Sequence, residues 1–345
     1  MQEYFNDLTD FIGTRLRGQE LYTAAFGAEE SDFVRFNGNE VRQAGHVTQR
    51  QLGLELIEGQ RHAQSTLTLS GDAEADKQQI DRLLDILRAT LPGLPEDPYL
   101  LYATEVRSSE RHGEDHLPPA PEAVSRIMKA AKGTDLVGLF AAGGIYNGFA
   151  NSLGQRNWFS TYSFNADWSL YHATDKAVKE AYAGFAWDDE AFRAKMTGAR
   201  DQLKVLRRTP RTIDPGGYRV YLSPVAVYDI LGTLAWGGFG LKDHRTKQTS
   251  LLRMVEGGAR LHPAVTISEN TAEGVAPNFQ SAGFIRPGRV ELIGGGCFRN
   301  CLTSPRSAKE YGVPTNGAST WEMPQSIDME PGGLPPDEVT RALDR

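Results

Sequence analysis

The segment 162–171 constrains the fold more than any other part of the chain, because large apolar side chains alternate there with polar ones. Tyr162, Phe164, Ala166, Trp168 and Leu170 occupy one set of positions, and Ser163, Asn165, Asp167, Ser169 and Tyr171 occupy the other. A period of two residues is that of a β-strand with one buried face. The chain must therefore build at least one long strand whose apolar side is covered by other elements.

A second alternating region lies near the N-terminus and predicts an antiparallel meander. Leucine alternates with other residues over 51–56, and after a turn the chain returns as a strand over 63–69. Upstream, Asn37-Gly38 follows a strand over 33–36, and this pair suits the positive φ angles of a two-residue hairpin turn. These segments predict neighbouring strands that are joined by tight turns.

Residues with the helical period fall in stretches that are separate from the strands. The predicted helices cover 4–16, 73–91, the residues up to Lys132 before the cap Gly133, 189–207, 225–234, and the stretch from Ser304-Pro305 to Gly312. Ser223-Pro224 marks the start of helix 225–234, since a hydroxyl N-cap followed by proline is a strong helix start. Long antiparallel β-meanders with segregated helices define an α+β fold.

Two domains are predicted, with a boundary close to the turn Asp214-Pro215-Gly216-Gly217. The N-terminal α+β domain covers 1–212 and contains the meander, helix 73–91, a proline-rich linker over 92–98 and long strands over 136–171. Within it, a strand over 136–142 leads to Gly143-Gly144 and then to a turn over 151–154. The C-terminal domain covers 213–345, is rich in β-structure, and contains strands over 218–222, 264–268 and 289–293.

The net charge of −7 and the lack of long apolar runs exclude several classes of protein. A negative chain is a poor non-specific ligand for nucleic acid, and nowhere are there the about 20 consecutive apolar residues that span a membrane. The acidic N-terminus has no secretory signal. The only cysteines, Cys297 and Cys301, form no disulfide framework and are expected to be buried thiols. We expect a cytoplasmic protein without nucleic-acid or membrane partners.

Three stretches, taken in order, carry a resemblance to a known family. They are the meander over 34–56, the turn over 151–154 with the alternating strand that follows it, and the C-terminal blocks 218–224, 265–268 and 294–312. Together they resemble the TldD/PmbA family of peptidases. The resemblance implies a two-domain protein, a dimer that encloses a cavity, and proteolysis of unfolded or extended peptides. Because chains of this family continue further, it also implies that the C-terminal domain is incomplete here.

The zinc motif of the family has no counterpart in this chain. Active members carry His-Glu-x-x-x-His on the helix after the Ser-Pro exit, where the histidines bind zinc and the glutamate activates water. In this chain Gly232, Thr233 and Gly237 stand at those positions, and none of them can do that work. The resemblance is therefore to the TldE-type side of the family, which lacks the motif and pairs with an active TldD-type subunit. Neither zinc nor another cofactor is expected.

These observations lead to one favoured hypothesis and two alternatives. The favoured protein is a non-catalytic subunit that binds extended peptide in proteolysis or peptide maturation, as a homodimer or as a heterodimer with a TldD-like metallopeptidase. The predicted peptide-binding residues are Ser268, Glu269, Asn270, Gln280 and Ser281. An open sheet edge there would receive the peptide through backbone hydrogen bonds. The alternatives are an independent metallopeptidase, with Asp243 and His244 at its site, and a stand-alone peptide-binding scaffold.

Other residues that could carry chemistry have simpler structural interpretations. His112 and His116 lie in a polar loop without the further cysteine or histidine that structural zinc requires. The glycines 294–296 lack a phosphate-binding pattern and predict a bulge or tight turn. No serine lies in a Gly-x-Ser-x-Gly context, which argues against a serine hydrolase. Asp243 and His244 would also fit a surface ion pair of little consequence.

Overall fold

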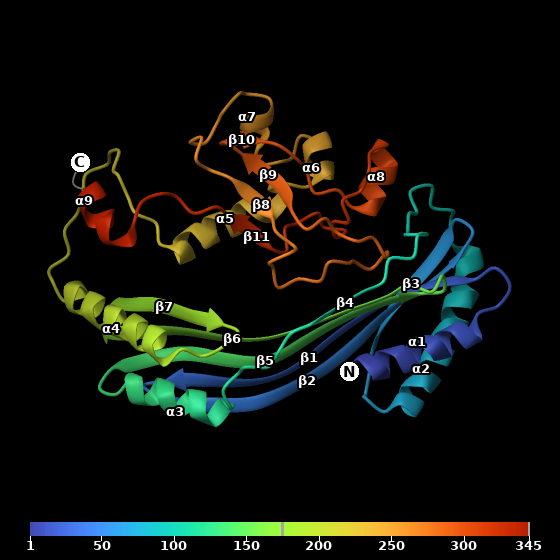
Figure 1. Ribbon diagram of the computed structural model, residues 1–345, viewed down its shortest axis with the longest axis horizontal. Helices are drawn as coiled ribbons and strands as arrows, with labels where there is room; N and C mark the ends of the chain where they lie inside the picture. Colours follow the sequence, from blue (N-terminus) through green and yellow to red (C-terminus); the bar gives the residue numbers. More distant parts are fainter. Residues whose placement is uncertain (174–175, 344–345) are drawn as a thin grey trace.

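The computed structural model describes residues 1–173 and 176–343, and its largest element is a seven-stranded sheet of long, curved strands (Figure 1). The strands are β1 (Leu21–Asn37), β2 (Glu40–Glu58), β3 (Arg61–Thr68), β4 (Ser109–His112), β5 (Asp135–Asn151), β6 (Arg156–Ala173) and β7 (Lys176–Gly184). Their order is β3-β2-β1-β5-β6-β4, and β7 also pairs with β6. All neighbours are antiparallel except β4 and β6. The predicted α+β class is confirmed.

The first hairpin forms as predicted, but its turn lies one residue later. Gly38 and Asn39 have φ angles of 60° and 58° and make the turn. Asn37 still pairs with Glu40 and therefore belongs to the strand. The two positive φ angles that a tight hairpin turn needs are therefore adopted by Gly38-Asn39 and not by the predicted Asn37-Gly38.

Strand β5 is longer than the sequence indicated. It continues through Gly143-Gly144 to Asn151, where the predicted turn follows. Gly143 lies opposite Ser31 of β1, and a Cβ atom on it would lie 2.2 Å from the carbonyl oxygen of Glu30. These glycines therefore allow close strand packing and do not end the strand.

Four helices cover one face of this sheet. They are α1 (Gln2–Arg15), α2 (Ala73–Thr90), α3 (Ala120–Ala130) and α4 (Asp189–Leu206), and each confirms a predicted helix. One core cluster joins α1 and α2 to Phe26 and Leu54, and another joins α3 and α4 to Phe140 and Trp168. These strand residues all lie on the same face, since their positions match in the strand register.

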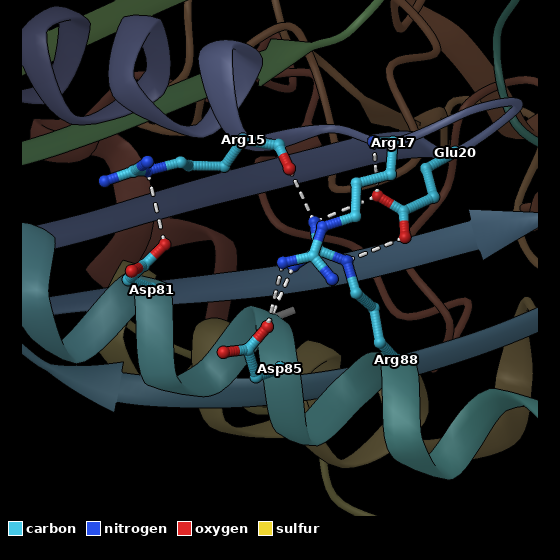
Figure 2. Close-up of polar contacts among 6 residues, drawn as sticks. All are labelled: Arg15, Arg17, Glu20, Asp81, Asp85 and Arg88. Atoms are coloured by element: carbon cyan, nitrogen blue, oxygen red, sulfur yellow. Dashed lines mark hydrogen bonds and ion pairs between the residues drawn. The ribbon is translucent and has the colours of Figure 1, made fainter.

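Polar contacts also connect the start of the sheet to the helices (Figure 2). The Arg88 guanidinium on α2 donates to both carboxylate oxygens of Glu20, at 2.7 and 3.0 Å. It also donates to the Arg15 carbonyl oxygen, at 2.6 Å, where α1 ends. The two charged side chains are only 13% and 9% exposed, so this is a nearly buried ion pair.

The C-terminal part lies over the other face of the sheet (Figure 1). It contains α5 (Pro224–Gly238), α6 (Leu241–Arg245), α7 (Leu252–Val255), α8 (Pro305–Tyr311), α9 (Val339–Leu343), β8 (Ile267–Glu269), β9 (Val290–Gly294), β10 (Cys297–Phe298) and β11 (Ile327–Met329). Short 3₁₀ turns cover Leu91–Gly93 and Pro336–Glu338. Phe149, Phe159 and Phe279 pack together between the sheet and this part.

The second sheet has the order β10-β9-β8-β11. The predicted strand over 289–293 and the helix from Ser304-Pro305 to Gly312 are confirmed, whereas the strand predicted over 264–268 begins only at Ile267. Gly295 and Gly296, with φ angles of 60° and 73°, make the predicted tight turn between β9 and β10.

The strand predicted over 218–222 is not formed. This segment is exposed, with Val220 at 65%, and it carries no ladder pairing within 1–173 and 176–343. Apolar composition favours a strand only where a neighbouring backbone supplies hydrogen bonds. The described chain ends with the short helix α9, and Asp344 and Arg345 lie outside the described residues. None of the helices described is both long and apolar enough to cross a membrane.

Candidate functional site

Helix α5 carries Gly232 and Thr233, two of the three positions at which the family resemblance places the zinc motif. The Ser223 hydroxyl accepts the N–H of Ala226 at 3.4 Å, and Pro224 begins the helix, as predicted. The helical conformation ends before Trp236, whose ψ is 101°, and Gly237 has a φ of 67°. Gly232 and Thr233 thus lie on the helix, whereas Gly237 lies beyond a kink.

A cavity of about 610 Å³ opens beside this helix, within the range of small-ligand sites. Its walls come from α5, from the loop after β8 and from the segment that leads into β11. The lining residues are Tyr228, Gly232, Ala235, Trp236, Asn270, Glu273, Gly274, Val275 and 323–328. We call this space the α5 cavity. It joins segments that are far apart in the sequence.

The lining of the α5 cavity includes polar and aromatic side chains. The Asn270 Nδ2 donates to Glu273 Oε2 and to Asp328 Oδ2, both at 3.0 Å, so one amide holds two carboxylates in place. From helix α5, Trp236 is 75% exposed and Tyr228 is 65% exposed. Large aromatic side chains left in water are frequent at sites that bind other molecules.

The residues present do not fit a zinc ion in the α5 cavity. Gly232 has no side chain, and the Thr233 hydroxyl donates to the carbonyl oxygen of Asp229 at 3.0 Å. Neither histidine nor cysteine lines the cavity. Within the part of the chain that the structure describes, no three or more His, Cys, Asp or Glu side chains gather as a metal site would require.

The prediction that Ser268 and Glu269 lie at an open sheet edge is wrong. Both are on β8, which pairs with β9 on one side and with β11 on the other. Glu269 is 5% exposed and accepts the N–H groups of Gln325 and Ser326, at 3.0 and 3.1 Å. Burial raises the pKa of its carboxyl group, although these N–H donors oppose the shift. Glu269 therefore holds the segment that leads into β11.

The other predicted peptide-binding residues divide between two places. Asn270 lines the α5 cavity, whereas Gln280 and Ser281 line a cleft of about 560 Å³ between the large sheet and the C-terminal part. Gln280 and Ser281 also line a smaller cavity of about 300 Å³ that continues from the cleft. The structure therefore does not bring the five predicted residues together in one site.

Asp243 and His244 line none of these cavities. The His244 Nε2 lies 2.8 Å from the carbonyl oxygen of Gly238, and its ring stacks on Phe298 with centroids 4.6 Å apart. No ion pair joins Asp243 to His244, contrary to the simpler interpretation of these residues. Their contacts instead stabilise the turn after α5.

The remaining sequence candidates are separated or partnered locally. His112 lies at the end of β4, 3.4 Å from Glu110, and His116 lies 2.8 Å from Glu114. The two cysteines are free and half-buried, where burial had been expected, and desolvation raises the pKa of the Cys301 thiol to about 11. A thiol with so high a pKa is a weak nucleophile near neutral pH.

A charged network in the cleft escaped the sequence analysis. The His62 Nδ1 lies 2.6 Å from Glu55 Oε1, and its Nε2 lies 3.3 Å from Asp97 Oδ2. Asp97 also accepts a hydrogen bond from Arg306 Nη1 on α8, at 2.5 Å. Asp97 lies in the proline-rich segment that was predicted to be a linker, so no functional contact was expected of it. It connects His62 of the large sheet to Arg306 of the C-terminal part.

Comparisons with known proteins agree with this architecture. Residues 215–345 match the family described as the PmbA/TldA metallopeptidase C-terminal domain. No curated protein matches the chain. Among solved structures, a proposed DNA gyrase modulator from Thermotoga maritima MSB8 has a TM-score of 0.76 at 12% identity, with 99% of this chain and 80% of that chain covered.

Two further solved structures share the fold. TldE from Thermococcus kodakarensis has a TM-score of 0.69 at 13% identity, with 99% of this chain and 80% of that chain covered. A proposed DNA gyrase modulator from Bacteroides thetaiotaomicron VPI-5482 has a TM-score of 0.66 at 14% identity, with 96% and 77% covered. Residues 215–345 are thus similar to the C-terminal domain of the PmbA/TldA metallopeptidase family, and almost the whole chain has the fold of these solved structures.

Proposed function

We propose that this chain is a non-catalytic, peptide-binding subunit that acts with a zinc-containing metallopeptidase of the same family in proteolysis or peptide maturation. The peptide is held in the α5 cavity. The observation that carries the proposal is the position of Gly232, which lines this cavity on the helix where the family's resemblance implies a zinc ligand. The cavity is present beside the helix, whereas Gly232 and Thr233 stand where the family resemblance implies a zinc ligand and a general base.

The shape and chemistry of the α5 cavity favour an extended peptide. Residues 325–328, which lead into and through most of β11, are consecutive in its lining. β11 pairs with β8 on one side only, and no strand among the described residues occupies its other edge. An extended peptide that pairs with this edge gains backbone hydrogen bonds, and its side chains contact Trp236 and Tyr228 of helix α5.

Two partner arrangements fit this proposal, a heterodimer with a TldD-like subunit and a homodimer. The heterodimer accounts better for Gly232 and Gly237, because a partner with an intact motif would supply the zinc that these positions cannot bind. An independent peptidase centred on His244 has less support, since that ring is stacked on Phe298 and bonded to a backbone carbonyl group.

Peptide binding and peptide cleavage by the isolated chain test the proposal. Fluorescence anisotropy with a labelled, unstructured twelve-residue peptide should show saturable binding, and mass spectrometry should show the peptide uncut after long incubation. Replacement Trp236→Ala should weaken binding about tenfold, the equivalent of about 1.4 kcal/mol, because an aromatic contact is lost. Phe185→Ala removes another aromatic side chain, 52% exposed, away from the cavity and serves as the control. Chelator-sensitive cleavage by the pure chain would overturn the non-catalytic role.

A further inference from the structure

The cleft between the large sheet and the C-terminal part has a floor made of unusually small side chains. Ala25 on β1, Gly53 on β2 and Thr66 on β3 lie side by side across three strands. All three line the cleft of about 560 Å³. A Cβ atom on Gly53 would make only ordinary contacts with the neighbouring strands, at 3.7 Å from the Ala25 carbonyl oxygen and 4.0 Å from the Thr66 hydroxyl, so the floor can accept a small side chain there. A flat floor of this kind admits the close approach of another backbone.

The charged groups of the cleft already satisfy one another. Glu55 is paired with His62, and Asp97 is paired with both His62 and Arg306. The Arg306 guanidinium also lies over the Tyr99 ring, at 5.3 Å from its centroid. A charged ligand would have to break these pairs. The paired charges of the network therefore favour neither a cation nor an anion as the ligand of the cleft.

The polar groups without partners in the cleft are neutral. The Gln280 Nε2 is buried and has no hydrogen-bond partner among the described residues. Its Oε1 accepts the Ala282 N–H at 2.5 Å, which fixes the direction of the amide. No hydrogen bond is made by the side chains of Gln64 and Thr66 within the described ranges, and both are exposed in the cleft. Neutral donors and acceptors above a flat floor match the amide groups of a polypeptide main chain.

We propose that this cleft is a second binding site for the main chain of an extended peptide, separate from the α5 cavity. Gln280 donates to a peptide carbonyl oxygen, while Ala25 and Gly53 leave room for the peptide backbone above the sheet. The smaller cavity next to the cleft shares Gln280 with it and shares Gln325 with the α5 cavity, so one long peptide reaches both sites. This inference rests on the proposed peptide-binding function and adds a length requirement to it.

The replacement Gly53→Val tests the cleft with little risk to the fold. Its φ is not positive and the Cβ contacts are ordinary, and valine is favoured over glycine in strands. The matched control is Gly27→Val on β1, where a Cβ atom meets nothing within 4 Å and which lines none of the cavities described above. Gln280→Leu removes the unpartnered Nε2 donor, together with the Oε1 that accepts the Ala282 N–H, at nearly constant size. Thermal melting should show that all three variants are folded.

Binding of a labelled, uncharged twelve-residue peptide is compared with that of its four-residue C-terminal portion. Gly53→Val and Gln280→Leu should weaken the twelve-residue peptide at least tenfold and leave the four-residue peptide unchanged, and Gly27→Val should change neither. Unchanged binding of the long peptide by Gly53→Val would overturn the cleft site while peptide binding in the α5 cavity stands. If the native chain binds neither peptide, the cleft site and the proposed function both fail.

Discussion

Replacement of Arg88 by methionine tests how the α1–α2 helix pair is held to the sheet. The change removes both hydrogen bonds to Glu20 and the one to the Arg15 carbonyl oxygen (Figure 2). Glu20, which is 9% exposed, then keeps the hydrogen bond from the Arg17 N–H but loses its ion-pair partner. Breaking a buried ion pair in this way costs about 3–5 kcal/mol, and we expect about 3 because both side chains keep some contact with water.

The effect should depend on pH with a definite sign. Burial alone raises the pKa of Glu20, but the hydrogen bonds from Arg88 and from the Arg17 N–H outweigh it, and the pKa lies below its ordinary value. A lowered pKa in the folded state stabilises the fold above the unfolded pKa, and this contribution is lost as the pH falls through the folded value. The difference between native chain and Arg88→Met should therefore shrink below about pH 4.5.

Urea unfolding, followed by circular dichroism at pH 7 and pH 3.5, measures both effects. Arg17→Met is the control, because its side chain is 70% exposed and its 3.5 Å contact with Asp85 should contribute under about 1 kcal/mol. The double replacement Glu20→Met with Arg88→Met removes the unpaired charge and should recover part of the loss. A loss below 1 kcal/mol for Arg88→Met, or an equal loss at both pH values, would refute this reasoning.

Two further predictions concern the sheet and its helices. Asp76→Ala should destabilise the chain by about 3 kcal/mol in urea unfolding, because the buried carboxylate accepts hydrogen bonds from Ser70, Gly71 and Tyr4. Burial raises the pKa of Asp76, but these hydrogen bonds outweigh it and lower the pKa, so the loss of stability should be smaller in acid. A loss that is larger in acid would contradict this role of Asp76. Gly143→Ala should destabilise the fold by about 3 kcal/mol, since its Cβ atom would clash with β1. Gly27→Ala should change the stability by under about 0.5 kcal/mol, because its Cβ atom meets nothing within 4 Å. Equal melting temperatures for the two variants would contradict the close approach of β5 to β1.

Elements with strong periodicity could be predicted from the sequence. Helices α2 and α4 and the strand β6 were expected because each has a continuous apolar face, and their ends lie within a few residues of the predicted ones, except the start of β6, which runs further upstream. The end of β5 could not be predicted, because Gly143-Gly144 has the composition of a turn and its role depends on the distance to β1. The division of the chain at residue 212 stays a prediction.

The site was predictable only where one local motif defines it. Gly232 was singled out because the family resemblance places the motif on the helix that starts at Ser223-Pro224; that helix is present and Gly232 lines the α5 cavity, while its role stays a prediction. The approach of Asn270 to Asp328 depends on the pairing of β8 with β11, and no periodicity relates residues so far apart. The error at Ser268 has the same cause, since a single sequence does not reveal which strands flank β8. Strand order is a property of tertiary structure and not of local pattern.

Native mass spectrometry of the tagged chain, purified gently from its own host, tests the proposed role as a non-catalytic subunit. We expect a metal-free chain in complex with a second polypeptide that carries an intact His-Glu-x-x-x-His motif and one zinc ion. A homo-oligomer with one zinc ion per copy of this chain would contradict it, because Gly232, Thr233 and Gly237 cannot bind that metal.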